Sequence, residues 1–237
     1  MARYAAVTFD ANGTLIGVAE PVGVVYARFA AAAGLVASPA EVEARFHTAL
    51  AAGPPLAFPG VSAGTHAGRE RAWWRTVVHE ALGHPAPDAR FETCSAALFA
   101  HYAKAAAWRT FAEVPEVLLA LRARGFQLAV VSNFDERLPP LLAALGIGPL
   151  VDCVIHSSAV GCAKPDPRIL HAAARALAVR ATDMLHIGDA PEDVAAARAA
   201  GAGAVRIDRT TARARDPERI DSLLALLQMP ALEGAQP

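Results

Sequence analysis

The hydrophobic positions of the chain fall into two patterns that alternate along most of its length. Short continuous apolar runs occupy residues 4–9, 126–131, 151–155, 184–188 and 204–207. Such runs are typical of strands that are buried on both faces of a sheet. Apolar residues spaced three or four positions apart predict helices around 114–121, 138–145, 169–177, 191–201 and 220–227. Together the two patterns predict an α/β fold with a doubly wound, Rossmann-like parallel sheet.

Residues 20–107 interrupt this alternation after the first strand. The segment is rich in Ala, Arg and His, with helical spacing and few strand signals. Helices are predicted over 21–34, from Ser38-Pro39 onward, over 69–83 and over 88–105, with a Gly/Pro-rich loop at 53–68. We therefore predict an all-helical domain inserted into the α/β domain. The predicted division is 1–17 and 108–237 for the α/β domain and 18–107 for the insertion.

The amino-acid composition and net charge argue against nucleic acid and membranes as partners. Of the 237 residues 54 % are apolar, and the formal net charge is -1, so nothing attracts the chain generally to nucleic acid or to an anionic membrane. The N-terminus has no signal-peptide pattern, and no apolar run reaches the roughly 20 residues that span a bilayer. We therefore expect a cytoplasmic protein that binds a small molecule at a local site. Oligomeric state has no signal in the sequence.

The cysteines add little chemistry. Cys94, Cys153 and Cys162 are an odd set without the spacing of a metal site. Cys153 and Cys162 lie in or beside apolar runs, so we predict buried thiols in a reducing compartment.

Polar residues stand where several of the apolar runs end. Asp10 follows the first run, Ser132 and Asn133 follow the second, and Asp189 follows a later one. Ligands of a doubly wound sheet bind outside the carboxyl ends of its strands, so these side chains are expected to form a cluster. Lys164 lies in a loop before a helix, in a chain where 20 of the 22 basic residues are arginines. A lysine retained there is therefore a further candidate for a contact at the site.

Four segments carry a resemblance to a known family. They are FDANGTL (9–15), VVSNFD (130–135), GCAKPDPRI (161–169) and HIGDAPEDV (186–194). In this order they resemble the four motifs of the haloacid dehalogenase superfamily. The resemblance spans nearly the whole chain and implies that the inserted helices are the cap domain of these hydrolases.

The resemblance implies a role for each candidate residue. Asp10 would be the nucleophile that forms an aspartyl-phosphate, and Lys164 would supply positive charge. Mg²⁺ would be the cofactor, held by oxygen ligands. The expected metal site comprises Asp10, the backbone carbonyl of Asn12, Asp189 and, through a water, Asp193. Ser132 and Asn133 would bind the substrate together with Lys164. Candidate cap contacts are Arg69, Arg71, Trp73, Trp74 and Arg75.

Each candidate also has a plainer structural interpretation. Asp10 can form a turn, Ser132-Asn133 can cap a helix that begins near Asp135, and Asp193 can favour the first turn of its helix. Asp166 is predicted to cap a helix, and His156 and His186 are predicted to lie in the core or at the rim rather than to act as catalysts. The tryptophans are predicted to belong mostly to the cap core.

The chain departs from the motif at Asn12. Phosphatases of the superfamily usually carry a second Asp there, which protonates the leaving group and then activates water. An amide cannot do this, and such acid–base help is worth about 10²–10⁴-fold. The resemblance therefore implies a Mg²⁺-dependent phosphatase of reduced activity on a small phosphorylated metabolite, with Asp10, Asn12 and Lys164 at the catalytic centre.

Two other hypotheses remain open. A 2-haloacid dehalogenase needs no proton for its leaving halide, and the dehalogenases of the superfamily also lack this Asp and work without metal. The clustered acids of GDAPED argue against it, because they would repel a carboxylate substrate. The third hypothesis is a weakly active or inactive family member that acts as a binding protein through its helical domain.

Overall fold

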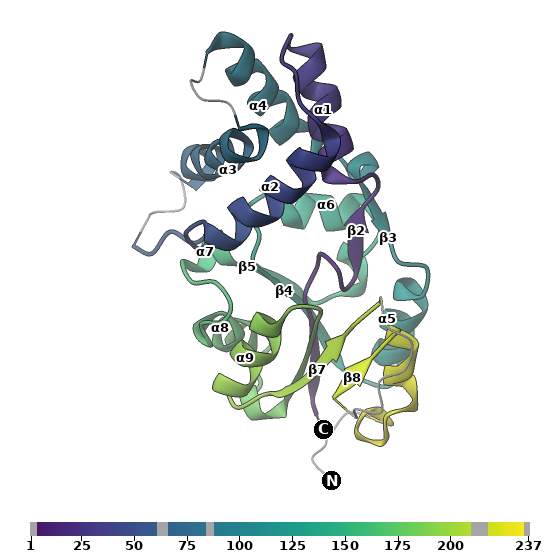
Figure 1. Cartoon of the computed structure of the whole chain (residues 1–237). Helices are drawn as coiled ribbons and strands as arrows, with labels where there is room; N and C mark the ends of the chain where they lie inside the picture. Colours follow the sequence, from purple (N-terminus) through teal and green to yellow (C-terminus); the bar gives the residue numbers. More distant parts are fainter. Residues whose placement is uncertain (1–3, 61–65, 84–87, 210–217, 235–237) are drawn as a thin grey trace.

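A six-stranded parallel sheet forms the centre of the molecule (Figure 1), in a computed structural model that describes residues 4–60, 66–83, 88–209 and 218–234. The strand order is β5-β4-β1-β6-β7-β8, and every neighbouring pair is parallel. The strands are β1 (Ala6–Phe9), β4 (Gln127–Ser132), β5 (Cys153–His156), β6 (Met184–Gly188), β7 (Gly203–Ile207) and β8 (Arg219–Ile220). The predicted α/β fold with a doubly wound parallel sheet is confirmed.

Helices cover both faces of this sheet. Side chains alternate between faces along a strand, so Val7 and Phe9 of β1 join one hydrophobic cluster and Ala6 joins another. The first cluster includes the apolar sides of α5 (Val114–Ala123) and α6 (Leu138–Ala144), and the second those of α8 (Arg168–Ala176) and α9 (Pro191–Ala199). Burial on two faces explains why the strands are continuous apolar runs.

The segment between the first two sheet strands folds into helices with a hydrophobic cluster of their own. These helices are α1 (Val22–Ala32), α2 (Pro39–Ala52), α3 (His66–Leu82) and α4 (Ala89–His101). Their shared core includes Tyr26, Phe46 and Phe91. Figure 1 shows them gathered at one end of the molecule, at the top of the view. The third predicted helix begins three residues earlier than expected, and residues 61–65 of the predicted loop lie outside the described part of the chain.

A short antiparallel ribbon connects this helical segment to the α/β domain. β2 (Ile16–Val18) pairs with β3 (Trp108–Thr110), with Gly17 opposite Arg109. The sequence analysis missed both strands. Three residues are too few to display an alternating pattern, and the pairing joins positions that lie far apart in the chain.

The predicted last helix over 220–227 is wrong. Arg219 and Ile220 form β8, and Leu223–Gln228 form a 3₁₀ helix, η5, which Ser222 caps through its side chain. The residues of η5 that bury their side chains, Leu223 and Leu226, are three positions apart, the repeat of a 3₁₀ helix. The remaining short elements are α7 (Ser157–Val160), η2 (Ala105–Ala107), η3 (Gly148–Leu150), η4 (Ala181–Asp183) and η6 (Pro230–Leu232).

The cysteines are unpaired and largely buried, and no described helix is suited to cross a membrane. Cys94 and Cys162 are buried, Cys153 is partly buried, and all of them are free thiols. Within the described residues, no helix combines the length and the apolar character that crossing a membrane requires.

Candidate active site

The predicted site residues meet at one cavity. β1 lies between β4 and β6, and Phe9 pairs with Val130 on one side and Ile187 on the other. The residues that follow these positions therefore emerge at the same edge of the sheet. A cavity of about 860 Å³ opens there. It is lined by every residue predicted for catalysis, metal binding or phosphate binding, namely Asp10, Asn12, Ser132, Asn133, Lys164, Asp189 and Asp193.

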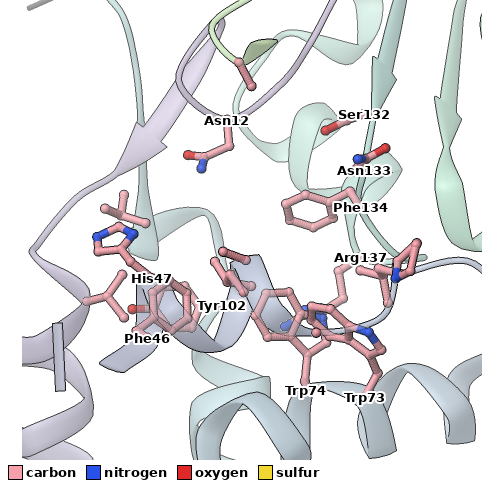
Figure 2. Close-up of a pocket in the computed structure, with 18 of the residues that line it drawn as sticks. Asn12, Phe46, His47, Trp73, Trp74, Tyr102, Ser132, Asn133, Phe134 and Arg137 are labelled. Atoms are coloured by element: carbon pink, nitrogen blue, oxygen red, sulfur yellow. The ribbon is translucent and has the colours of Figure 1, made fainter. Parts of the chain in front are cut away.

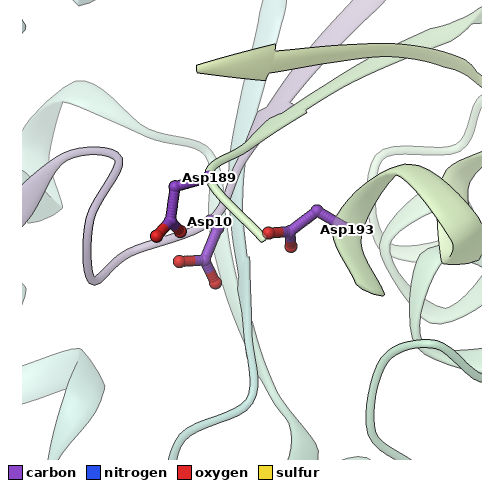
Figure 3. A group of neighbouring side chains, drawn as sticks. All are labelled: Asp10, Asp189 and Asp193. Atoms are coloured by element: carbon purple, nitrogen blue, oxygen red, sulfur yellow. The ribbon is translucent and has the colours of Figure 1, made fainter. Parts of the chain in front are cut away.

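Three carboxylates form the acidic part of the cavity (Figure 3). Oxygens of Asp10, Asp189 and Asp193 lie within 4.8 Å of one another. Burial raises the pKa of Asp189 to about 6, and the charges of Asp10 and Asp193 add to this effect. Burial likewise raises the pKa of Asp10, against the influence of Lys164. Three acids with one lysine leave a deficit of positive charge, which a divalent cation with oxygen ligands would correct.

Lys164 is the cation at the centre of this cluster. Its ammonium Nζ donates to Asp10 Oδ1 at 2.6 Å, to the Val131 carbonyl at 2.9 Å and to Asp193 Oδ1. Burial opposes charge on this side chain, but Asp10 and Asp193 outweigh it and raise the pKa of Lys164 above its usual value. The same interaction, with help from His186, holds the pKa of Asp193 below its usual range despite burial. Lys164 therefore remains charged beside Asp10.

Asn133 fixes the loop that carries Lys164. Its side-chain Nδ2 donates to the Lys164 carbonyl at 2.9 Å, and the Lys164 backbone N–H donates to its Oδ1 at 2.7 Å. The alternative that Ser132-Asn133 cap a helix is wrong, because α6 begins at Leu138 and its N-terminal flanking residue is Arg137. Ser132 is buried at the end of β4 and contributes a hydrogen bond to Asp10.

Asp193 is oriented by contacts behind the cavity. Its Oδ2 accepts from the Ala190 N–H at 3.0 Å, and its Oδ1 lies 3.3 Å from His186 Nε2. His186 Nδ1 lies 2.9 Å from Thr8 Oγ1. Asp193 thus stabilises the first turn of α9, as its structural interpretation suggested, and lines the cavity as well. His156 and His186 are buried and neither lines the cavity, in agreement with their predicted core positions.

The loop after Asp10 depends on Gly13. Its φ is +88°, a left-handed conformation that glycine adopts without strain, and a Cβ there would collide with the carboxylate of Asp189. Arg209 holds the same loop from outside, with Nε donating to the Gly13 carbonyl at 3.1 Å and Nη2 to the Thr14 carbonyl at 2.6 Å. Glu113 in turn pairs with Arg209 at 2.6 Å. Sequence analysis missed both residues, since neither lies in a motif.

Gly13→Ala should destabilise the protein far more than Gly60→Ala. Gly60 provides a matched control, because its φ is +73° but a Cβ there would have no neighbour within 4 Å among the described residues. We expect a cost of about 1–2 kcal/mol at Gly60 from left-handed backbone strain alone. At Gly13 the collision with Asp189 should lower the free energy of unfolding by about 1–3 kcal/mol more. Urea unfolding of both variants measures the difference, and equal costs would contradict the close approach to Asp189.

Asp189→Asn should stabilise the metal-free protein at neutral pH. The folded pKa of about 6 lies above the value of roughly 3.9 in an unfolded chain, so the Asp189 carboxyl costs stability as pH rises from about 4 to 6. Removing its charge should add about 1–3 kcal/mol to the free energy of unfolding at pH 7.5, and much less at pH 4. The measurement is thermal unfolding in a chelator at both pH values.

The matched control for this variant is Asp166→Asn. Asp166 accepts a hydrogen bond from the Arg168 N–H and pairs with the side chain of Arg168. It therefore bonds the start of α8 from one position before the N-cap, which is Pro167 and not Asp166 as predicted. Its pKa is lowered by that pairing, so its replacement should not stabilise the protein at neutral pH. A melting temperature of Asp189→Asn at or below that of the wild type at pH 7.5 would contradict the electrostatic argument.

The opposite wall of the cavity comes from the helical segment and is largely aromatic (Figure 2). In the figure, Asn12, Ser132 and Asn133 lie on one side, and Trp73, Trp74 and Phe46 on the other. Both tryptophans pack against the core of the helical segment, as expected, and both also line the cavity, where one was considered. The sequence analysis left open which of the five candidate cap contacts face the site, and the other three, Arg69, Arg71 and Arg75, do not line the cavity. Arg75 pairs instead with Glu92 at 2.5 Å, and Arg71 stacks on Phe99.

A buried polar contact joins the two walls. Trp74 Nε1 donates to Asp135 Oδ2 at 2.6 Å. The same carboxylate accepts two bonds from Arg137, from Nε at 2.8 Å and from Nη2 at 2.6 Å, and Arg137 also donates to the Phe99 carbonyl at 3.2 Å. This contact places α3 and α4 over the carboxyl edge of the sheet.

Comparison with known proteins identifies the family. A model described as haloacid dehalogenase-like hydrolase matches residues 4–201. The chain belongs to this family. It is 39 % identical over 186 residues to haloacid dehalogenase-like hydrolase domain-containing protein 3 of Mus musculus, which covers 77 % of this chain and 72 % of that protein. The resemblance inferred from the four motifs is therefore confirmed, and the protein is a member of a hydrolase family.

More distant relatives include named phosphatases and a dehalogenase. A phosphoglycolate phosphatase of Pectobacterium atrosepticum is 38 % identical over 96 residues, which are 40 % of this chain and 41 % of that protein. The crystal structure of a predicted phosphoglycolate phosphatase from Haemophilus somnus has a TM-score of 0.67 at 20 % identity, covering 96 % and 98 % of the chains. A dehalogenase structure has a TM-score of 0.70 at 21 % identity, covering 98 % and 99 %. At these identities the structural likeness shows the shared fold.

Proposed function

We propose that this family member is a Mg²⁺-dependent phosphatase that acts on a small phosphorylated molecule through an aspartyl-phosphate on Asp10. The observation that carries the proposal is the ion pair of 2.6 Å between Lys164 Nζ and Asp10 Oδ1, inside a cluster of three acids. Lys164 lowers the repulsion between the Asp10 carboxylate and an incoming phosphate dianion, and it favours the ionised form of Asp10 that attacks, against the burial that raises the pKa of this carboxyl.

The donor set at the cavity suits Mg²⁺. Asp10 and Asp189 offer carboxylates, and the backbone carbonyl of Asn12 is assigned as a third ligand. Both oxygens of Asp193 already accept hydrogen bonds, from Lys164 and from the Ala190 N–H, which favours a contact through water rather than direct ligation. When bound, the ion would supply positive charge for the phosphoryl oxygens and for the three acids.

The proposed reaction has two displacements at phosphorus. Asp10 attacks, the bond between phosphorus and the ester oxygen breaks, and the leaving group departs with the electron pair. Lys164 and the Ser132 hydroxyl donate to the phosphoryl oxygens as charge builds on them. Water then attacks phosphorus of the aspartyl-phosphate, the bond between phosphorus and the Asp10 oxygen breaks, and the Asp10 carboxylate is freed. Both protons of that water leave with the released phosphate as H2PO4⁻, since Asn12 accepts none. Asn133 acts as a positioning residue, since it holds the Lys164 backbone.

Asn12 limits both steps. It lines the cavity two residues after the nucleophile, but its amide neither donates a proton to an alkoxide nor accepts one from water. We therefore infer reduced activity on ordinary alkyl phosphates, by the roughly 10²–10⁴-fold that such acid–base help provides.

The helical segment is proposed to act as a cap over this site, with the domain division at 1–17, 18–107 and 108–237. Its separate hydrophobic cluster supports the division, as do the residues that it contributes to the cavity wall. A cytoplasmic location and a small-molecule substrate remain predictions.

The dehalogenase hypothesis has one observation in its favour, which is that Asn12 offers no general acid. Against it, the Asp189 and Asp193 carboxylates lie beside the nucleophile and would repel a 2-haloacid.

The test of the proposed function is hydrolysis of p-nitrophenyl phosphate with Mg²⁺ and with a chelator. We expect slow turnover that requires the ion. Halide release from 2-chloropropionate in the presence of the chelator would establish the dehalogenase instead. A folded protein with background rates on both substrates and on a broad phosphate panel would favour the binding protein.

A further inference from the structure

The cavity is much larger and more aromatic than a small anionic metabolite requires. Its volume of about 860 Å³ lies toward the upper end of the roughly 300–1,000 Å³ that ligand sites usually occupy. Beyond the polar end, its wall is made of aromatic side chains from both parts of the chain, with Val22 and Leu50 among the aliphatic ones. The aromatic residues include Phe46, Trp73, Trp74, Tyr102, Trp108 and Phe134. This wall favours a flat apolar body.

The cations that line the cavity are already neutralised by acids, as far as the described residues extend. Lys164 bonds Asp10 and Asp193, and both nitrogen donors of Arg137 that face Asp135 are used. Arg137 is further covered by the Phe99 ring, 4.0 Å from the ring centre.

The remaining charges of the wall are acidic in balance. His47 lies 3.4 Å from Glu43 on the same helix, and Glu192 adds another acid. Among the described residues of the lining, a carboxylate on the leaving-group side of a substrate would therefore meet no free positive charge, and Glu43 and Glu192 would repel it.

Asn12 restricts the leaving group independently of the wall. Without a general acid, the ester oxygen must depart unprotonated, so a weakly basic oxygen leaves faster. A phenolic oxygen, with a pKa of about 10 in its protonated form, is far less basic than an alkoxide. The catalytic loop and the aromatic wall thus select for the same chemical group.

We infer that the substrate is an aryl phosphate, a monoester in which phosphorus is bonded to the oxygen of an uncharged aromatic ring that occupies the Trp73–Trp74 side of the cavity. This inference rests on the proposed phosphatase function and specifies its substrate class. Asp10 attacks phosphorus, the bond between phosphorus and the aryl oxygen breaks, and the phenolate leaves with the electron pair.

The first experiment compares kcat/KM for a matched series of esters with Mg²⁺. Phenyl phosphate and benzyl phosphate share the ring but differ in the basicity of the leaving oxygen. Phenyl and 2-naphthyl phosphate share a phenolic oxygen but differ in apolar area. Phosphoglycolate is the small anionic comparison. We expect kcat/KM for phenyl phosphate to exceed that for benzyl phosphate by at least about 100-fold. We expect kcat/KM for 2-naphthyl phosphate to exceed that for phenyl phosphate by about 10-fold, because more apolar area is buried.

The second experiment moves the preference with one side chain. Leu50 is 37 % exposed and lines the cavity, whereas Val24 is 42 % exposed and does not line it, so the two sites tolerate the same change. Leu50→Arg should lower kcat/KM for 2-naphthyl phosphate by about 5-fold and raise it for phosphoglycolate by a similar factor. Val24→Arg should change neither. Opposite changes on two substrates cannot result from partial unfolding.

The outcomes distinguish failure of the aryl substrate class from failure of the phosphatase function. If phosphoglycolate or benzyl phosphate matches 2-naphthyl phosphate while Mg²⁺ is still required, the aryl class is wrong and the phosphatase stands. Unchanged preferences in Leu50→Arg would likewise overturn the role of this wall. If no ester is hydrolysed by the folded protein, the phosphatase itself is overturned, together with its substrate class.

Discussion

Asp10→Asn should reduce the Mg²⁺-dependent hydrolysis of p-nitrophenyl phosphate to the uncatalysed rate, a loss of at least about 10⁴-fold. The amide has no ionised oxygen to attack phosphorus, so no aspartyl-phosphate forms. In the wild type, Lys164 Nζ donates to Asp10 Oδ1 at 2.6 Å, and the amide oxygen of Asn can accept the same hydrogen bond. The substitution also removes one negative charge from a cluster of three acids. The variant is therefore expected to fold.

Steady-state kinetics and trapping of the phosphorylated protein in acid measure this prediction. Wild type should carry phosphate that is stable in acid and released by hydroxylamine, whereas Asp10→Asn should carry none. Asp166→Asn, at a partly exposed position just before α8 and outside the cavity lining, is the matched control and should keep wild-type rates. Residual Mg²⁺-dependent turnover above about 1 % in Asp10→Asn would rule out Asp10 as the nucleophile.

Asn12→Asp should accelerate hydrolysis of an alkyl ester such as benzyl phosphate by about 10²–10⁴-fold. The new carboxyl group lines the same cavity as the nucleophile and can protonate the leaving alkoxide, then accept a proton from the attacking water. For p-nitrophenyl phosphate the leaving oxygen needs no proton, so the gain should come only from the second displacement. Wild type should then show a burst of p-nitrophenol that Asn12→Asp lacks.

Asn12→Ala is the control for this substitution, since it removes the amide without adding a carboxyl group. It should give no acceleration on either ester. A gain of the same size in Asn12→Ala would show that relief of crowding, rather than proton transfer, explains the effect. No gain in Asn12→Asp, with Mg²⁺ dependence retained, would mean that the missing proton shuttle does not limit the reaction.

The sequence was enough to predict that the site residues lie together, because they stand at the carboxyl ends of strands that run in the same direction. Asp10, Ser132 and Asp189 each end a continuous apolar run, and parallel strands deliver their carboxyl ends to one edge. Their clustering at the cavity follows from that rule and from the order of β4, β1 and β6 in the sheet.

The polar contacts that hold the site together were not predictable in the same way. Trp74 and Asp135 are 61 positions apart, and Arg209 lies 196 positions from Gly13. No local sequence pattern marks either pair. The residues around Arg209 would be the same whether its side chain were exposed or bound to a distant loop carbonyl. The predicted final helix was wrong for a related reason, because leucines three apart satisfy a 3₁₀ helix as well as an α-helix.

Motif order and apolar runs can be read along the chain in one dimension, so they were enough to indicate the family, the parallel sheet, and the acids and the lysine at its carboxyl edge. What faces these residues across the cavity depends on packing in three dimensions. Whether Trp73 and Trp74 or Arg69, Arg71 and Arg75 reach the cavity depends on how α3 is rotated about its axis, and that rotation is set by packing against α2 and α4 and by the Trp74–Asp135 bond. All five residues lie within two turns of one helix, so the helical pattern alone places them on a surface without saying which part of that surface covers the site.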